Sequence, residues 1–266
     1  MAKKKVHYGV CLYCEEHKEL QRSHSINRSI FRSLLKACGD TNAARVISSS
    51  SNIVKSSNDN WTDRLMCSSC ESYFNRHFDD YGVHALRGET KGITILETRN
   101  SVIYQNIDTT RIILYILSLY WRGSASNHPA YKYLKITGNV NYNLRLILKS
   151  REWNFKFISI KISVLFDSIG ALDSKTIKQF MVTPFSRKHG IDNTFSFYFL
   201  FEGFFIEIFF GKMRHSYKKK GSWIAPSVMY MKCDKVDLHS INALHPVFAQ
   251  MFKAKRYMEL HNIPIK

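Results

Sequence analysis

The stretches Cys11-Leu12-Tyr13-Cys14 and Cys67-Ser68-Ser69-Cys70 decide how the first third of this chain folds. Each places two thiols in one tight turn, and four thiolates from two such turns form the ligand set of a structural zinc ion. A single Cys-x-x-Cys pair would be open to a redox interpretation, whereas two pairs favour a metal. The sequence therefore predicts one zinc ion held by Cys11, Cys14, Cys67 and Cys70, at the base of a long inserted loop.

The overall composition is that of a protein able to bury a core. The 266 residues are 45% hydrophobic and 14% aromatic, which excludes global disorder. The two remaining cysteines, Cys38 and Cys233, have no evident partner, and this usage suits a reducing compartment. No signal peptide is readable, and the most apolar run, 195–210, is too short to span a bilayer and contains two glutamates. We therefore expect a cytoplasmic protein that does not insert into membranes.

The net charge of +18 is distributed unevenly along the chain. Residues 1–90 carry 13 Lys and Arg against 10 Asp and Glu, whereas residues 91–266 carry 26 against 11. Such an excess favours polyanions, because each phosphate that pairs with Lys or Arg releases counterions. Solubility combined with an acidic protein partner is the alternative explanation. We expect nucleic acid, DNA above all, as the partner, and we expect residues 91–266 to make most of the contacts with it.

Two groups of basic residues are candidates for phosphate contact. The main group follows an aromatic hairpin and surrounds Tyr217; it consists of Lys212, Arg214, Lys218, Lys219 and Lys220. Arg145 and Lys149 form a second patch on an expected helix. A basic run with an aromatic residue inside it fits nucleic-acid binding, although a solvated turn has the same composition.

Helical patterns come early in the chain and strand patterns come late. Helices are expected at 27–35, 70–78, 108–121, where Asp108 is the N-cap, and 141–149. Strands are expected at 8–14, 155–166, 195–210, where Glu202-Gly203 turns a hairpin, and 223–232. This order favours an α+β fold over alternating βαβ units. A boundary near residue 90 would separate a zinc module, 1–90, from a basic α+β domain with an antiparallel sheet, 91–266.

Three motifs together resemble the zinc-containing HNH endonucleases. They are the first cysteine pair, the run Leu20-Gln21-Arg22-Ser23-His24-Ser25-Ile26, and the run Leu65-Met66-Cys67-x-x-Cys70-Glu71. The resemblance is closest to a divergent bacterial branch, and Trp121-Arg122 resembles that branch more weakly. It covers residues 8 to about 85. It implies a ββα-metal module and cleavage of phosphodiester bonds in DNA, with anti-phage defence as a suggested context.

The resemblance also implies roles for individual residues. His24 would be the general base, and the four cysteines would hold structural zinc. Glu71, Asn75 and His77 are the candidate ligands of a catalytic Mg²⁺ or Mn²⁺. Glu71 and Asn75 share a helix face, whereas His77 lies about 240° around the helix from Glu71.

The chain departs from the family at three places. Ser23 stands where an Asp ligand would be, Asn27 stands where a Pro usually follows, and no clear middle Asn precedes Cys67. Each of these candidates also has an alternative, structural role. His24 would pack the cysteine turn, Glu71 would complement a helix dipole, and His77 would be a solvated residue at a helix end. Two further functions therefore stay open: a non-catalytic zinc-finger protein that binds nucleic acid, and an interaction subunit of a larger defence complex.

Overall fold

The computed structural model describes residues 6–37, 44–47, 54–153, 157–189, 194–213 and 222–246, together with the single positions 218, 249 and 253. The first part of the chain contains β1 (Tyr8–Val10), β2 (His17–His24), α1 (Arg28–Ala37), β3 (Ala44–Ile47), β4 (Val54–Ser57), β5 (Thr62–Cys67), α2 (Ser68–Phe74), a π-helix (Asn75–Asp79) and α3 (Asp80–Leu86). The second part contains β6 (Thr94–Glu97), β7 (Ser101–Gln105), α4 (Thr109–Ala125), α5 (Gly138–Ser150), β8 (Ile158–Phe166), α6 (Ser174–Ile177), β9 (Met181–Lys188), β10 (Phe195–Phe201), β11 (Phe204–Phe210) and β12 (Tyr230–Asp237). Short 3₁₀ turns occur at Pro129–Tyr131, Leu238–Ser240 and Asn242–Leu244.

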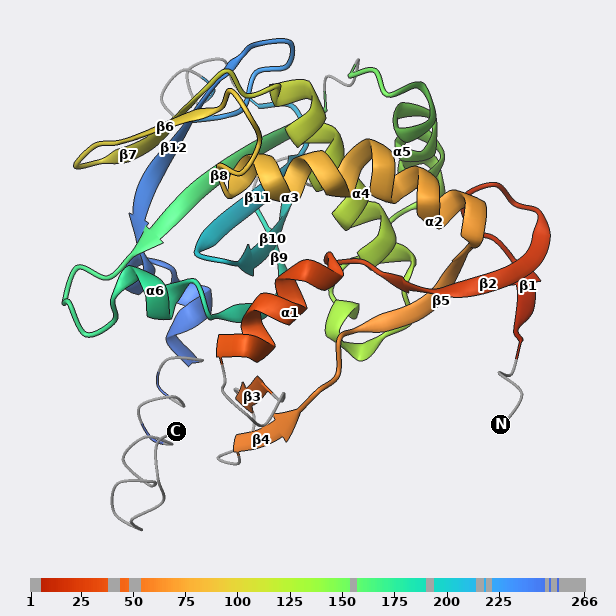
Figure 1. Ribbon diagram of the computed structural model, residues 1–266, viewed down its shortest axis with the longest axis horizontal. Helices are drawn as coiled ribbons and strands as arrows, with labels where there is room; N and C mark the ends of the chain where they lie inside the picture. The colour runs from red at the N-terminus through yellow and green to blue at the C-terminus, as the bar shows by residue number, and fades with distance from the viewer. Residues whose placement is uncertain are drawn as a thin grey trace.

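The strands form three sheets (Figure 1). Strands β1, β2 and β5 form a three-stranded antiparallel sheet, and β3 pairs with β4 alone. The large sheet has seven strands in the order β6-β7-β12-β8-β11-β10-β9. Its neighbours pair antiparallel except for β12, which runs parallel to β8. The expected α+β class with an antiparallel sheet is confirmed at this level of detail.

Strand β8 and the β10–β11 hairpin form as their side-chain patterns predict. Ile158, Ile160 and Ile162 alternate along β8 and are all buried in the main core. The hairpin turns at Glu202 and Gly203, whose φ angles of 49° and 77° are those that a tight two-residue turn requires. The hairpin thereby pairs two strands rich in aromatic residues, of which β11 lies beside β8.

Helix α4 is the central element that joins the sheet to the other helices (Figure 1). Asp108 caps it as predicted, because its carboxylate accepts a hydrogen bond from the Arg111 backbone N–H at 3.1 Å. The ring of Tyr120 packs against Phe197 and Phe210 of the sheet, with centroids 4.8 and 5.2 Å away. Neighbouring elements cover α4 on nearly every side, so that all of its residues from Ile112 to Gly123 are buried.

One hydrophobic core contains residues from both parts of the chain. Tyr13 packs edge-on against Trp121, and Phe74 lies against the same ring at 5.4 Å. Gly82 of α3 is so close to α4 that a Cβ placed there would lie 2.1 Å from the Tyr115 ring. The expected division at residue 90 stays a prediction, and this shared core spans it.

The strand expected at 223–232 is shifted towards the C-terminus. Strand β12 begins at Tyr230, and Trp223 makes only an isolated bridge to Lys161. The backbone between them is held by α4 instead, because the Thr109 hydroxyl donates to the Val228 carbonyl at 2.8 Å. None of the helices among the described residues has the length and apolar character needed to cross a membrane.

Candidate metal centre and adjoining pocket

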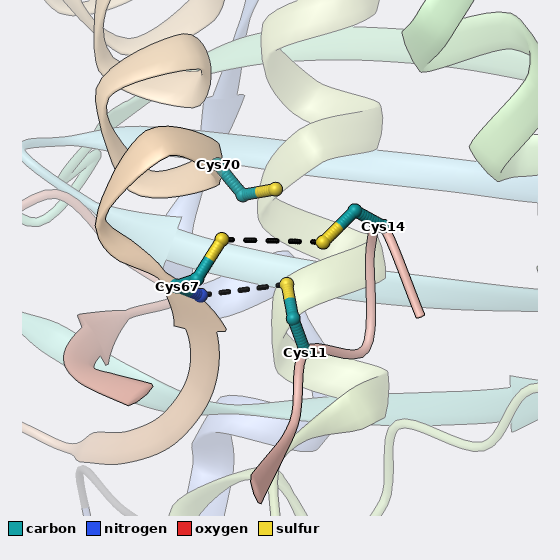
Figure 2. A group of neighbouring side chains, drawn as sticks. All are labelled: Cys11, Cys14, Cys67 and Cys70. Carbon is teal, nitrogen blue, oxygen red and sulfur yellow. Dashed lines mark hydrogen bonds between the residues drawn. The ribbon is translucent and has the colours of Figure 1, made fainter. Parts of the chain in front are cut away.

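The four cysteines of the two pairs meet in a single cluster, as predicted (Figure 2). Their Sγ atoms all lie within 4.8 Å of one another, and the Cys14 and Cys67 sulfurs are 4.0 Å apart. A tetrahedral zinc ion with Zn–S bonds of about 2.3 Å requires sulfurs about 3.8 Å apart. The cluster therefore has the ligand type and the spacing of a site that could bind a metal such as zinc.

The local backbone presents these thiols from two turns. Cys11 and Cys14 lie in the turn between β1 and β2, which closes through a bond from Glu15 N–H to the Cys11 carbonyl at 2.8 Å. Cys67 ends β5, and Cys70 lies in the first turn of α2. The Cys67 N–H donates to the Cys11 Sγ at 3.4 Å, which ties the two turns together directly (Figure 2).

The thiol acidities show which charges a bound cation would neutralise. Burial raises the pKa of Cys14 and of Cys70. Burial also opposes ionisation of Cys67, but hydrogen bonds from Ser69 and from the Cys70 backbone lower the pKa of Cys67 to about 6. Four thiols packed this closely cannot all be thiolates unless a positive ion neutralises their charge.

The cluster lies at one end of a hairpin that is followed directly by a helix. Strands β2 and β5 pair antiparallel, and His24, the last residue of β2, is opposite Thr62. Helix α2 begins at the residue after β5 and carries Glu71. This order of two antiparallel strands and a helix brings His24 and Glu71 to the same pocket, although 46 residues separate them in sequence.

The pocket has a volume of about 270 Å³ and a predominantly polar wall. Its lining residues come from the end of β2, the start of α1, the α2 and π-helix segment, and α4; they are His24, Asn27, Arg28, Glu71, Ser72, Asn75, Asp79 and Arg122. Three of the predicted site residues, His24, Glu71 and Asn75, are therefore brought together.

Two polar atoms of the residues that line this pocket are buried without a hydrogen-bond partner among the described residues. They are Nε2 of His24 and Oε1 of Glu71. Burial, followed by the charges of Arg28, Arg122 and Arg22, lowers the pKa of His24 to about 4. Burial also raises the pKa of Glu71, against the opposing effects of Ser23 and Arg122. An imidazole that is neutral at pH 7 and a carboxylate with a free oxygen can accept a proton and a cation, respectively.

A π-helix aligns the acidic side chains on the pocket wall. Positions four apart in an α-helix drift by about 40° per step, so Asp79 would lie about 80° from Glu71. The wider turn over Asn75–Asp79 reduces this drift, and both carboxylates line the pocket. Asp79 is buried and accepts two hydrogen bonds from Arg122, at 2.8 and 2.5 Å, so this pair forms a fixed part of the wall.

His77, the third predicted ligand on this helix, lies outside the pocket. Its ring is 4.5 Å from that of Tyr73, and its Nδ1 is 3.1 Å from the Arg151 guanidinium. The helical angle between Glu71 and His77 accounts for this separation. The structure therefore groups His24 with Glu71 and Asn75 but without His77.

The candidate phosphate-binding residues of α5 contact the first cysteine turn. Arg145 forms an ion pair with Glu15 at 2.5 Å, and Lys149 lies 5.7 Å from the centroid of the Tyr13 ring. Of the basic run, Lys212 and Lys218 are exposed, whereas Arg214, Lys219 and Lys220 lie outside the described residues. Binding of phosphate by these residues stays a prediction.

Sequence reasoning did not assign a role in the pocket to Asn27, Arg28, Asp79 or Arg122. Arg122 had a usable signal in the sequence, because a charged side chain within the apolar run 112–123 requires a buried partner. The sequence signal for Asp79 was weaker: it follows Glu71 and Asn75 at the same interval of four residues. That these two residues, 43 apart, are partners follows only from the packing of α4 against the π-helix.

A second group of metal-ligating residues among the described ones consists of Asp167, Asp237 and His239. Asp167 accepts from the Leu172 backbone N–H at 2.8 Å and faces His239 Nε2 at 2.9 Å. Asp237 accepts from the Ser168 hydroxyl at 2.6 Å. These contacts join the loop after β8 to the end of β12, which gives the group a structural role.

No protein-family model matches this chain, and no curated protein or solved structure matches it either.

Proposed function

We propose that this chain is a metal-dependent endonuclease of the HNH type, which hydrolyses phosphodiester bonds in DNA. The observation that carries the proposal is the pocket that His24, at the end of β2, lines together with Glu71 and Asn75 of the helical segment that follows β5. A base beside oxygen ligands is the arrangement that metal-assisted hydrolysis requires. The cysteine cluster would bind structural zinc and hold the hairpin against α2.

The residues of the pocket fit a hard divalent cation. Glu71 offers a carboxylate oxygen without a protein partner, and Asn75 offers an amide oxygen on the same helix face. Oxygen ligands of this kind suit Mg²⁺ or Mn²⁺. When bound, the ion would stabilise charge on the phosphate and acidify the attacking water, which a base as weak as His24 requires.

In this proposal His24 carries the proton transfer. Its Nε2 takes a proton from a water molecule whose oxygen then bonds to phosphorus, and the bond from phosphorus to the leaving oxygen breaks. His24 is available for this step because its lowered pKa keeps it neutral at pH 7. Arg122, fixed by Asp79, keeps a positive charge behind Glu71 and so favours the ionised carboxylate.

A second function is supported by Ser23. The family's Asp ligand is replaced there by a hydroxyl that is fully buried, and a neutral hydroxyl is a poor ligand for Mg²⁺. The same fold would then be a non-catalytic zinc protein that binds nucleic acid, or an interaction subunit of a larger complex. Loss of catalysis would leave the cysteine cluster and the positive rim of the pocket intact.

A cleavage assay separates these functions. Plasmid DNA, single-stranded DNA and RNA are incubated with the zinc-loaded protein in Mg²⁺, in Mn²⁺ and without added divalent ion; a chelator is avoided because it would also remove zinc. Cleavage should require the added ion, and His24→Ala should lower its rate by about 10²–10⁴-fold. His77→Ala is the matched control, because this histidine lies outside the pocket, and it should cleave as the wild type does.

Two results would contradict the endonuclease. One is undiminished cleavage by His24→Ala, since the activity would then come from another source. The other is the absence of cleavage from every substrate and ion by protein whose zinc content and melting temperature are normal. Nucleic-acid binding without cleavage would favour the non-catalytic alternative.

A further inference from the structure

Helix α1 carries a basic stripe on its exposed face that begins at the pocket. Its members are Arg28, Arg32 and Lys36, which are spaced four residues apart and are all exposed. Arg28 is also a lining residue of the pocket. At a rise of about 1.5 Å per residue, the stripe extends about 12 Å along the helix. The opposite face of α1, with Ile30 and Phe31, is buried in the core.

The charges of this stripe are not neutralised by ion pairs within the described part of the chain. Among the described residues, neither Arg28 nor Arg32 nor Lys36 forms an ion pair, and α1 itself contains no Asp or Glu. A cation at a helix N-terminus opposes the helix dipole, so Arg28 reduces the stability of the helix that carries it. Stability therefore gives no reason for an arginine at this position.

The residues at the beginning of α1 also line the pocket. The Asn27 side chain caps the helix by accepting from the Ser29 N–H at 2.8 Å, and Asn27 itself lines the pocket. Arg22, on β2, adds a further exposed cation whose charge acts on His24 together with that of Arg28. Arg28 thus brings a positive charge to the pocket from α1, whereas Glu71 and Asp79 line it from α2 and the π-helix.

We propose that the stripe formed by Arg28, Arg32 and Lys36 binds the phosphate backbone of nucleic acid and leads one strand into the pocket. The proposal rests on the proposed function, since it places the substrate of that same pocket. Over about 12 Å the stripe can face about three or four phosphates of a strand, which are about 3.4 Å apart along the duplex axis. Phosphates are the partner because three cations without internal acidic partners match a row of negative charges.

Substitution on the helix surface tests this directly. The variant Arg28→Ala/Arg32→Ala/Lys36→Ala removes three charges at exposed positions where alanine favours the helix, so the fold should be retained. The control Lys91→Ala/Arg99→Ala/Arg187→Ala removes the same charges from exposed positions in the large-sheet region. Both sets are made in the His24→Ala protein, so that no cleavage disturbs the measurement.

Binding is measured by fluorescence anisotropy with a labelled 20-base-pair duplex and with its single strand, between 50 and 200 mM KCl. The stripe variant should bind at least tenfold more weakly at 100 mM salt. Its slope of log affinity against log salt should be shallower by about two to three, near 0.9 for each lost contact. The control set should bind within about twofold of the parent.

The proposal is overturned if the stripe and control variants bind equally well, or if the parent binds neither probe. An acidic protein partner would then be the better explanation of the stripe. The endonuclease proposal fails separately, in the cleavage assay. The wild-type protein could fail to cleave while the stripe variant binds nucleic acid more weakly and with a shallower salt dependence. That result would support nucleic-acid binding by the stripe and refute the endonuclease.

Discussion

Glu71, in the region around the cysteine cluster (residues 8–86), and Glu207, in the region around the large sheet (residues 94–237), differ in how their carboxylates are held. In the sheet region, Glu207 accepts hydrogen bonds from Ser196 and Tyr198, at 2.6 and 3.0 Å. In the cysteine region, atoms of Glu71 and His24 are buried without a partner in the described structure. Buried carboxylates nearly always have hydrogen-bond partners, so the free oxygen of Glu71 is an observation that supports the ligand site proposed in the first region.

The two regions also differ in how they use charge. The sheet region has the larger positive excess, but part of it is neutralised by contacts such as Lys235 with Glu97 at 2.6 Å and Lys161 with Asp234 at 3.7 Å. The cysteine region is close to balanced, yet the stripe on α1 has no such partners among the described residues. The net charge of a segment therefore does not by itself locate a binding surface.

The largest expected effect is the loss of structure when a zinc ligand is removed, and it should be confined to the cysteine region. Purified protein should contain about one zinc ion per chain, and Cys67→Ser should lose it and unfold residues 8–86, because structural zinc contributes about 10–16 kcal/mol in zinc-finger peptides. Cys233→Ser is the control, since this cysteine is equally buried but lies in the sheet. Elemental analysis and hydrogen exchange by region provide the readouts. Protein without zinc, or unchanged exchange in Cys67→Ser, would refute the metal centre.

A smaller effect is expected at the buried pair that joins the regions. Arg122→Met leaves Asp79 buried without its partner and should lower the free energy of unfolding by about 3–5 kcal/mol. The double variant Asp79→Leu/Arg122→Met should recover much of this loss, because neither charge then remains. Urea unfolding measures both. Lys235→Ala, which breaks an exposed pair, should cost no more than about 1 kcal/mol. If Arg122→Met lowers the free energy of unfolding no more than Lys235→Ala does, the buried pair is dispensable.

The smallest effect tests whether the regions share one core. Gly82→Ala places a methyl group against the buried Tyr115 ring and should cost about 1–3 kcal/mol. Gly138→Ala, in α5, meets no atom within 4 Å and should be neutral or stabilising by up to about 1 kcal/mol. Thermal melts of the two variants provide the comparison. If Gly82→Ala behaves like Gly138→Ala, α3 and α4 are not tightly packed, and the regions would be closer to independent domains.

The sequence predicted the individual helices and strands of the site better than the contacts between them. The helix starting at the second cysteine turn was expected as one continuous helix at 70–78, whereas it changes to a π-helix at Asn75. The contact of Asp79 with Arg122 in this segment is also not specified by any pattern within residues 70–80. His77 could be separated from Glu71 by helical geometry alone, because that angle is a local property.

The sequence by itself determined features that depend on neighbouring residues. These include the two cysteine turns, the Asp108 cap, the Glu202-Gly203 hairpin and the strand alternation of β8, since capping, turn geometry and periodicity act over a few positions. Only the tertiary structure decided that Arg122 faces Asp79, that β12 lies parallel to β8, and that the stripe of α1 begins at the pocket. These contacts join residues far apart in the chain, and their energies depend on how whole elements pack into the shared core.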